Sequence, residues 1–152
     1  MRLYPARCRL LLILLLAVAG TQVLAADGLV NTDKQGIAIH GYDPVAYFLG
    51  GKPLPGKAEL AYQWSGATWL FSSTDNRQTF IENPQRYAPQ FGGFCAYAAS
   101  YGQFADVDPH AWSIVNGKLY LNYNLRVRQI WRPRAAEFNG DAEQLWPTMT
   151  QP

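Results

Sequence analysis

The chain has 152 residues and a formal net charge of +2. Without residues 1–25, which we expect to be removed, 127 residues remain, and ten basic residues face eleven acidic ones. The expected mature net charge is therefore about −1, which argues against nucleic acid or an anionic membrane as a partner. A chain of this length can form one compact domain with a hydrophobic core.

The N-terminus has the pattern of a secretory signal peptide. Arg2, Arg7 and Arg9 precede an apolar run over residues 10–19, and Val23-Leu24-Ala25 supplies the residues before a cleavage point. The run is about half the ~20 residues needed to cross a bilayer. We expect cleavage after Ala25, export to the periplasm with an extracellular location as the alternative, and no transmembrane segment in the mature protein.

Cysteine usage limits how the mature fold is stabilised. Cys8 leaves with the signal peptide, so Cys95 remains as the single thiol. An intramolecular disulfide is then excluded, while an intermolecular one through Cys95 stays open. The fold must depend on packing, to which twenty aromatic residues beyond the signal peptide can contribute.

The first part of the mature chain predicts short elements. Residues 26–36 are polar and are expected to form a flexible segment, followed by a short strand over Ile37–Ile39. Asp43-Pro44 is a helix-start signal, with Asp as the N-cap and Pro at the first helical position. A helix over Val45–Leu49 is expected, followed by a loop over Lys52–Lys57.

A hairpin and a helix are predicted next. Tyr62–Phe71 alternates around a Ser65-Gly66 turn. Ser72 or Ser73 is expected to cap a helix whose inner face carries Phe80 and Ile81. Asn83-Pro84 ends that helix, and one further turn is expected over Pro84–Tyr87.

The next segment contains the mature cysteine. Gly92-Gly93 precedes a short helix expected over Phe94–Ser100, and Asp108-Pro109 is expected to form a turn. Trp112–Leu121 predicts a second hairpin, because Asn116-Gly117 suits the positive φ angles of a two-residue type I′ turn.

The C-terminal part predicts helix. Asn124 is the expected cap, and one helical face is formed by Val127, Trp131, Ala135 and Phe138. Pro133 should kink or restart this helix, and Asn139-Gly140 should break it. A last turn is expected over Asp141–Trp146, with residues 148–152 as a tail. Together these elements predict a single α+β domain of antiparallel hairpins packed against short helices.

Several motifs resemble those of exported bacterial YHS-domain proteins. Gly41-Tyr42-Asp43-Pro44-Val45-Ala46-Tyr47-Phe48 resembles the opening motif of that family, and Trp69–Ser73 with Asn83-Pro84 is similar to its core pattern. Tyr87–Tyr97, with Gly92-Gly93-Phe94-Cys95-Ala96, is similar to the continuation found in the exported branch. The resemblance covers about residues 37–147, and it implies a YHS-like domain over that range.

The resemblance implies a metal-binding module, but the cysteines of the metal-type pattern are missing. Ala46 follows Asp-Pro-Val where that pattern has a cysteine, Ser72 occupies a second such position, and the segment 73–76 occupies a third. Affinity for soft metals depends on thiolates. A metal site in this chain would therefore need other ligands.

A non-enzymatic binding module is the leading functional hypothesis, with Cu or Zn, or a small ligand, as the occupant. The candidate metal ligands are Cys95, His40, His110, Asp43 and Asp108. Their side chains suit either metal, although His40 and His110 lie 55 and 15 residues from Cys95 and form no ligand-spacing motif.

Two alternatives remain open. In the first, Cys95 is a buried packing residue, and the protein binds a ligand or a protein through an aromatic groove or through the arginines at 126, 128, 132 and 134. In the second, the protein is a thiol enzyme or redox protein with Cys95 as nucleophile, His110 as base and Asp108 as the residue that orients the base.

Overall fold

A computed structural model describes residues 28–151. The predicted signal peptide and its cleavage site lie outside these residues, so export and location remain predictions. Within the described residues, no helix combines the length and the apolar character that crossing a membrane requires.

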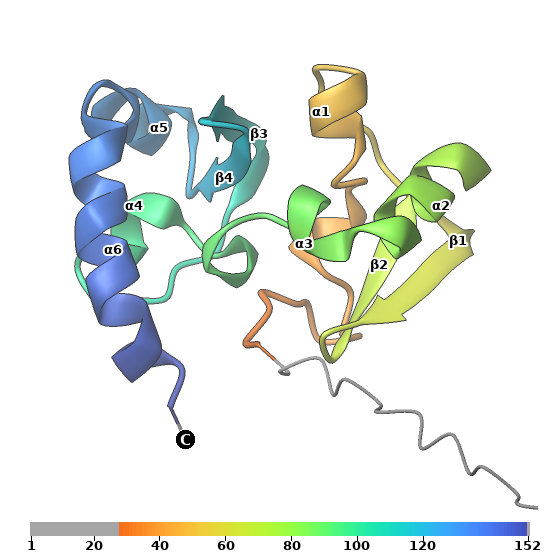
Figure 1. Cartoon of the computed structure of the whole chain (residues 1–152), viewed down its shortest axis with the longest axis horizontal. Helices are drawn as coiled ribbons and strands as arrows, with labels where there is room; N and C mark the ends of the chain where they lie inside the picture. The colour runs from red at the N-terminus through yellow and green to blue at the C-terminus, as the bar shows by residue number, and fades with distance from the viewer. Residues whose placement is uncertain (1–27, 152) are drawn as a thin grey trace, which may run out of the picture.

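The fold is a small single-domain α+β structure, as the sequence predicts (Figure 1). Its first half contains η1 (Ile39–Gly41), α1 (Ala46–Leu49), β1 (Lys57–Trp64), β2 (Ala67–Phe71), α2 (Thr74–Glu82) and α3 (Pro84–Tyr87). Its second half contains η2 (Phe91–Gly93), α4 (Ala96–Ala99), β3 (Asp108–Val115), β4 (Lys118–Asn122), α5 (Leu125–Trp131), η3 (Arg132–Arg134) and α6 (Ala135–Met149). Each half thus has one antiparallel hairpin with its own helices.

Both predicted hairpins are confirmed, and their turns have the same backbone geometry. Trp64 pairs with Ala67 across Ser65 and Gly66, whose φ angles are 51° and 72°. Val115 pairs with Lys118 across the second turn, where φ is 51° at Asn116 and 73° at Gly117. Positive φ at both central residues matches the right-handed twist of the flanking strands.

Two helix caps are also confirmed. The Ser73 hydroxyl accepts a hydrogen bond from the backbone N–H of Asn76 at 3.1 Å and starts α2. The Asn124 side chain accepts one from the N–H of Val127 at 2.9 Å and starts α5. Each cap satisfies a backbone donor that has no partner within its helix.

The C-terminal helix differs in part from the prediction. The helix does restart near Pro133, because α5 ends at Trp131 and η3 precedes α6. Asn139-Gly140 does not break it: α6 is continuous to Met149, so residues 148–149 are helical and not tail. Phe138 and Ala142 are buried on the inner face of α6, and their packing outweighs the weak helix preference of Asn and Gly.

Two other expectations were wrong. Asp108-Pro109 is the start of β3 and not a turn. Ile37–Ile39 forms no strand, since Ile37 and Ala38 make only isolated bridges and Ile39 enters η1. In the described part of segment 26–36, the Asp33 carboxylate accepts hydrogen bonds from the N–H groups of residues 35 and 37, both at 2.9 Å, and the flexibility of the segment stays a prediction.

The core consists of two clusters, and one of them joins the two halves of the chain. The first cluster packs Trp69, Phe71 and Phe80 of the first half with Leu119 and Leu121 of β4. The second lies under α6 and contains the buried residues Phe91, Ala96, Ala99, Tyr120, Trp131, Ala135, Phe138 and Ala142. Because β4 contributes to both clusters, the two halves pack as one unit.

Two short left-handed turns, η1 and η2, meet at this junction. The φ angles are 42°, 56° and 75° along Ile39–Gly41 and 53°, 60° and 82° along Phe91–Gly93. Non-glycine residues adopt such angles at a cost of roughly 1–2 kcal/mol each. A Cβ atom at Gly92 would lie 1.9 Å from the carbonyl oxygen of Leu29, and one at Gly93 would lie 2.6 Å from the Ile39 side chain.

Asn31 connects the two turns. Its backbone N–H donates to the carbonyl of Gly92 at 2.8 Å, and its own carbonyl accepts from the N–H of Ile39 at 3.1 Å. Its side-chain amide donates to the carbonyl of Gly93 at 3.2 Å and to Asp106 at 3.0 Å. These bonds hold η1 against η2 and compensate for the strain in both.

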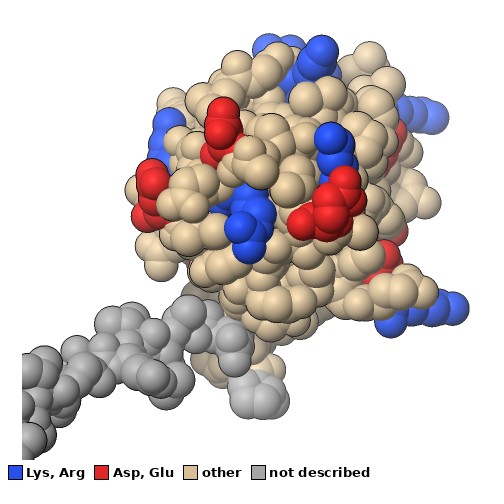
Figure 2. All heavy atoms as spheres, turned by 90° about the vertical axis from the view of Figure 1, so that its right-hand side faces the viewer, with Lys and Arg blue, Asp and Glu red and all other residues tan. Residues whose placement is uncertain are grey.

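Charged side chains are mixed on the face formed by α1, α2 and β1. Figure 2 shows lysines and arginines interspersed with acidic residues on this face. Such an arrangement gives no extended field of one sign there.

We predict that Asn31→Ala lowers the free energy of unfolding by about 1–3 kcal/mol, because the buried carbonyl of Gly93 and the partly exposed Asp106 carboxylate both lose a donor. Thr32→Ala is the matched control, since Thr32 is an exposed neighbour whose backbone pairing does not depend on its side chain. Urea unfolding measures both variants. Equal stability of the two variants would contradict the role assigned to Asn31.

Candidate functional site

Cys95 is a buried core residue at the start of α4. Its side chain is 1% exposed and packs within the first core cluster. The sulfur accepts a hydrogen bond from the N–H of Tyr123 at 3.3 Å and lies 3.9 Å from the side-chain oxygen of Asn122. This arrangement favours the packing alternative, because buried cysteines away from cationic groups are usually inert.

His40 is paired with a residue that the sequence did not single out. Its Nε2 atom lies 2.8 Å from a carboxylate oxygen of Asp106, and both side chains are substantially exposed. The same oxygen also accepts hydrogen bonds from the Asn31 amide and the N–H of Val107. His40 therefore belongs to the network that surrounds Asn31.

The Asp106 carboxylate is stabilised in its charged form. Partial burial opposes ionisation, but hydrogen bonds from Asn31, the N–H of Val107 and His40 outweigh it and lower the pKa of Asp106. A lowered pKa in the folded state means that this group stabilises the fold above the ordinary carboxyl pKa. The contribution is lost as the pH falls through the lowered value, and it is small because water screens an exposed pair.

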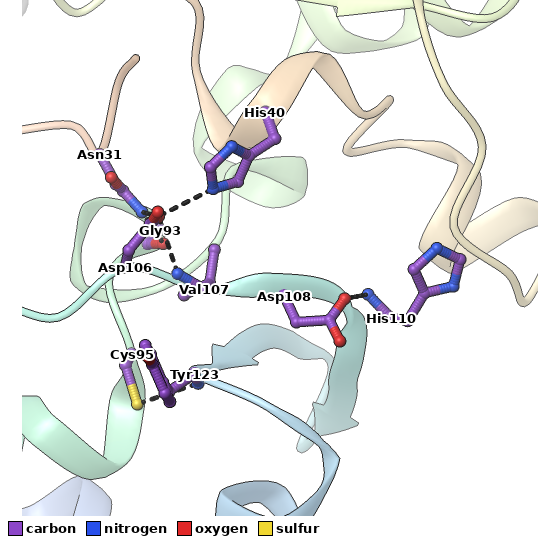
Figure 3. A network of polar contacts seen from close by, with 9 residues as sticks. All are labelled: Asn31, His40, Gly93, Cys95, Asp106, Val107, Asp108, His110 and Tyr123. Carbon is purple, nitrogen blue, oxygen red and sulfur yellow. Dashed lines mark hydrogen bonds and ion pairs between the residues drawn. The ribbon is translucent and has the colours of Figure 1, made fainter.

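His110 and Asp108 lie together on β3, away from Cys95. The His110 ring faces Tyr42, whose hydroxyl is 3.3 Å from Nε2, and its backbone N–H donates to the Asp108 carboxylate at 2.9 Å. Asp108 thus holds the backbone of His110 and not its ring. Figure 3 shows His110 far from the Cys95 sulfur, which points toward Tyr123, so the predicted nucleophile and base are not paired.

Asp43 is the centre of a buried hydrogen-bond network. One carboxylate oxygen accepts from the N–H groups of Val45 and Ala46 at 2.9 and 3.2 Å. The other accepts from the N–H and hydroxyl of Ser72 at 2.9 and 2.6 Å and from the Asn76 amide at 2.7 Å. The Asp43 carboxylate therefore holds the turn before α1 and fastens it to the segment that starts α2. The helix itself begins at Ala46 with Val45 as its N-cap, two residues later than the Asp-Pro signal predicts.

The three positions at which the metal-type pattern has cysteines converge on this carboxylate. Ala46 contributes its backbone N–H, Ser72 both its N–H and its hydroxyl, and Asn76, in the third segment, its amide. Five donors reach two oxygens that offer about four lone-pair sites, so the hydrogen-bonding capacity of the carboxylate is fully used. The space is thus filled by a polar network in which Asp43 acts as the acceptor.

The five predicted metal ligands do not fit a preformed Cu or Zn site. Cys95, His40, His110 and Asp43 have separate partners, and among residues 28–151 no three His, Cys, Asp or Glu side chains are grouped as a metal site needs. Ligand atoms in a real site lie about 2.0–2.3 Å from the metal. Metal binding by these residues therefore stays a prediction that solution measurements must test.

An aromatic pocket lies where the two halves of the chain meet. It has a volume of about 210 Å³, and its walls include Trp64, Trp69 and Trp146. Gly28, Leu29, Val30, Ser65, Gln85, Ala88, Pro89 and Gly92 complete the lining. None of these residues carries a charge, so the pocket suits an uncharged ligand.

The tryptophans of this pocket are held in place by other aromatic rings. Trp64 lies 5.9 Å from Trp69 and 5.6 Å from Phe80 between ring centroids, and its carbonyl accepts from the Trp69 indole N–H at 3.0 Å. Trp146 lies 5.5 Å from Phe91 and 6.4 Å from Phe94. The tryptophans and tyrosines of the sequence allowed an aromatic groove as an alternative, but the sequence could not show that residues 64 and 146 share one pocket.

Comparisons of the chain with protein-family models, with curated proteins and with solved structures found no match. The resemblance to YHS-domain proteins accordingly rests on the sequence motifs alone and stays a prediction.

We predict that the Cys95 thiol reacts slowly in the native protein and quickly after unfolding. In a Cys8→Ser background Cys95 is the single thiol, so a colorimetric thiol reagent added with and without denaturant reports it directly. Cys95→Ser should lower the free energy of unfolding by about 1–3 kcal/mol, because it places a hydroxyl in an apolar core. Full labelling of the native protein at the rate of the unfolded chain would contradict a packing role.

Proposed function

We propose that this protein is a YHS-like, non-enzymatic binding module, and that its ligand is a small uncharged aromatic compound. The observation that carries the proposal is the pocket between Trp64 and Trp146. Its volume of about 210 Å³ exceeds the roughly 150 Å³ of an apolar cavity that accommodates benzene. It is smaller than the ~300–1,000 Å³ of pockets for drug-sized ligands.

The chemistry of the walls supports this class of ligand. The rings of Trp64 and Trp146 can pack against an aromatic or flat aliphatic ring, and such contacts favour offset or edge-to-face geometry. Ser65 already bonds to Gly28, with its Oγ accepting from the backbone N–H at 3.1 Å. Gln85 lines the pocket with an amide that can donate to or accept from one polar substituent on the ring.

The position of the pocket supports a binding role for the fold as a whole. Its lining comes from the first residues described, from the β1–β2 hairpin, from α3 and the loop after it, from η2 and from α6. The strained turn η2 places Gly92 in this lining, and its packing against Leu29 fixes the adjacent wall. A ligand in the pocket would therefore touch both halves and add to the contacts between them.

We predict that the protein binds indole or p-cresol in isothermal titration calorimetry, and that Trp146→Ala weakens this binding at least tenfold by removing one wall. Tyr101→Ala is the matched control, because Tyr101 is an exposed aromatic residue outside the pocket. The control should bind as the wild type does. Equal losses in the two variants, or no saturable binding of either probe, would overturn the proposal.

The alternative, in which the protein binds a metal ion, has its own test with the same protein. Equilibrium dialysis against Zn²⁺, and against Cu⁺ under reducing conditions, is compared between the Cys8→Ser protein and the same protein with Cys95→Ser. We expect equal metal uptake in both, because the Cys95 sulfur is enclosed by the core. Stoichiometric uptake that disappears with Cys95→Ser would favour the metal-binding function over the aromatic pocket.

A further inference from the structure

One segment of the second half is strongly basic although the chain as a whole is nearly neutral. No acidic residue occurs between Asp108 and Glu137, and this stretch contains Lys118 and the arginines at 126, 128, 132 and 134. Four of these five cations lie on α5 and η3, at one end of the second half (Figure 1). The surface there differs from the mixed face formed by α1, α2 and β1 in Figure 2.

The outer face of α5 combines arginines with apolar side chains. Helical backbone angles continue to Arg132, so Leu125 and Arg132, seven residues apart, lie on one side of the helix. Arg126 and Ile130, four residues apart, lie beside them. All four are exposed, Leu125 by 50% and Ile130 by 48%, whereas Trp131 on the inner side is fully buried. The four outer side chains are therefore not needed for the core.

The arginines of α5 have no carboxylate to neutralise them. Arg134 pairs with Glu137. Within residues 28–151, Arg126, Arg128 and Arg132 form no ion pair with an acidic side chain. Burial first, and then the charge of Arg132, lower the pKa of Arg128. Like charges four residues apart destabilise a helix, so an anion bound at this face would relieve the repulsion.

Arg128 is held in position by the neighbouring strand. Its Nε donates to the hydroxyl of Ser113 on β3 at 3.0 Å, and Ser113 is itself buried. This bond uses one of the five N–H donors of the guanidinium. The remaining donors have the planar arrangement that binds a phosphate through two parallel hydrogen bonds.

We infer that the outer face of α5 docks the protein on the surface of an anionic phospholipid bilayer. Arg126, Arg128 and Arg132 lie at lipid phosphates, while Leu125 and Ile130 enter the interface between them. Charge complementarity calls for an anionic partner. The exposed apolar side chains favour a bilayer over an acidic protein, because the membrane interface offers phosphates and acyl chains side by side.

The charge balance of the whole chain does not oppose this docking. Salt screens exposed charges beyond about 10 Å, so attraction to a surface depends on the charges that lie nearest to it. The inference is also independent of the tryptophan pocket, whose lining includes no residue of α5. Either site can be correct when the other is not.

The test is co-sedimentation of the mature protein, whose fold lies within residues 28–151, with lipid vesicles. One set contains phosphatidylglycerol and phosphatidylcholine in equal amounts, and the other contains phosphatidylcholine alone. Binding to the anionic vesicles is expected to be at least tenfold tighter and to weaken as salt is added. No binding to the anionic vesicles, or equal binding to both sets, would overturn the inference.

Paired variants separate the charge of this face from the net charge. Arg126→Gln combined with Arg132→Gln should weaken binding about 25-fold, since each arginine near an anionic surface contributes about fivefold. Lys52→Gln combined with Lys57→Gln is the matched control, because it removes the same charge from two exposed positions in the first half. The control should bind as the unsubstituted protein does. Equal losses in the two double variants would contradict docking through α5.

A third variant distinguishes a bilayer from an acidic protein. Leu125→Ser combined with Ile130→Ser should weaken binding to the anionic vesicles at least fivefold, because the apolar contacts with the interface are lost. Binding to poly-L-glutamate, the probe for an acidic protein partner, should be weaker than binding to the vesicles. Vesicle binding unchanged in this variant, or tighter binding to poly-L-glutamate than to the vesicles, would overturn the assignment to a bilayer.

Discussion

The contact between the two left-handed turns η1 and η2 is the constraint on which much of this structure depends. Two runs of three consecutive positive φ values are unfavourable by themselves, and Ile39 and Phe91 are not residues that adopt them readily. Asn31 compensates through four hydrogen bonds that reach both turns and Asp106. Because η2 leads directly into Cys95 and α4, the same contact fixes where the thiol lies. It also fixes Gly92 in the wall of the tryptophan pocket.

A second polar centre plays a comparable part in the first half. Asp43 accepts five hydrogen bonds, from Val45, Ala46, Ser72 and Asn76, and the last three lie where the metal-type pattern that the sequence resembles has cysteines. A carboxylate bonded to all these donors can stabilise the fold without any further group, because a buried polar network is favourable when every member is hydrogen-bonded. In this chain the opening motif therefore has a structural explanation. The proposed binding site at the tryptophan pocket lies elsewhere.

The sequence predicted the local elements more successfully than the contacts between them. Short-range signals such as Asn116-Gly117, Ser73 and Asn124 depend on a few neighbouring residues, and the structure confirms each of them. The continuity of α6 through Gly140 depends on packing around Phe138 and Ala142, which local preference does not include.

Cys95 and the two histidines could be named as candidates from residue type. Their separate partners Tyr123, Asp106 and Tyr42 follow only from the tertiary fold. Asp106 and Asn31 carried no motif, and 75 residues separate them in the chain.

The central claim is that ligand binding occurs at the tryptophan pocket while Cys95 serves packing. A crystal structure of the protein grown with indole tests both parts in one measurement. The account predicts the indole ring between Trp64 and Trp146, with the Cys95 sulfur still against the backbone N–H of Tyr123. Indole bound at another place, or a Cys95 sulfur turned toward His40 or coordinated to a metal ion, would contradict it.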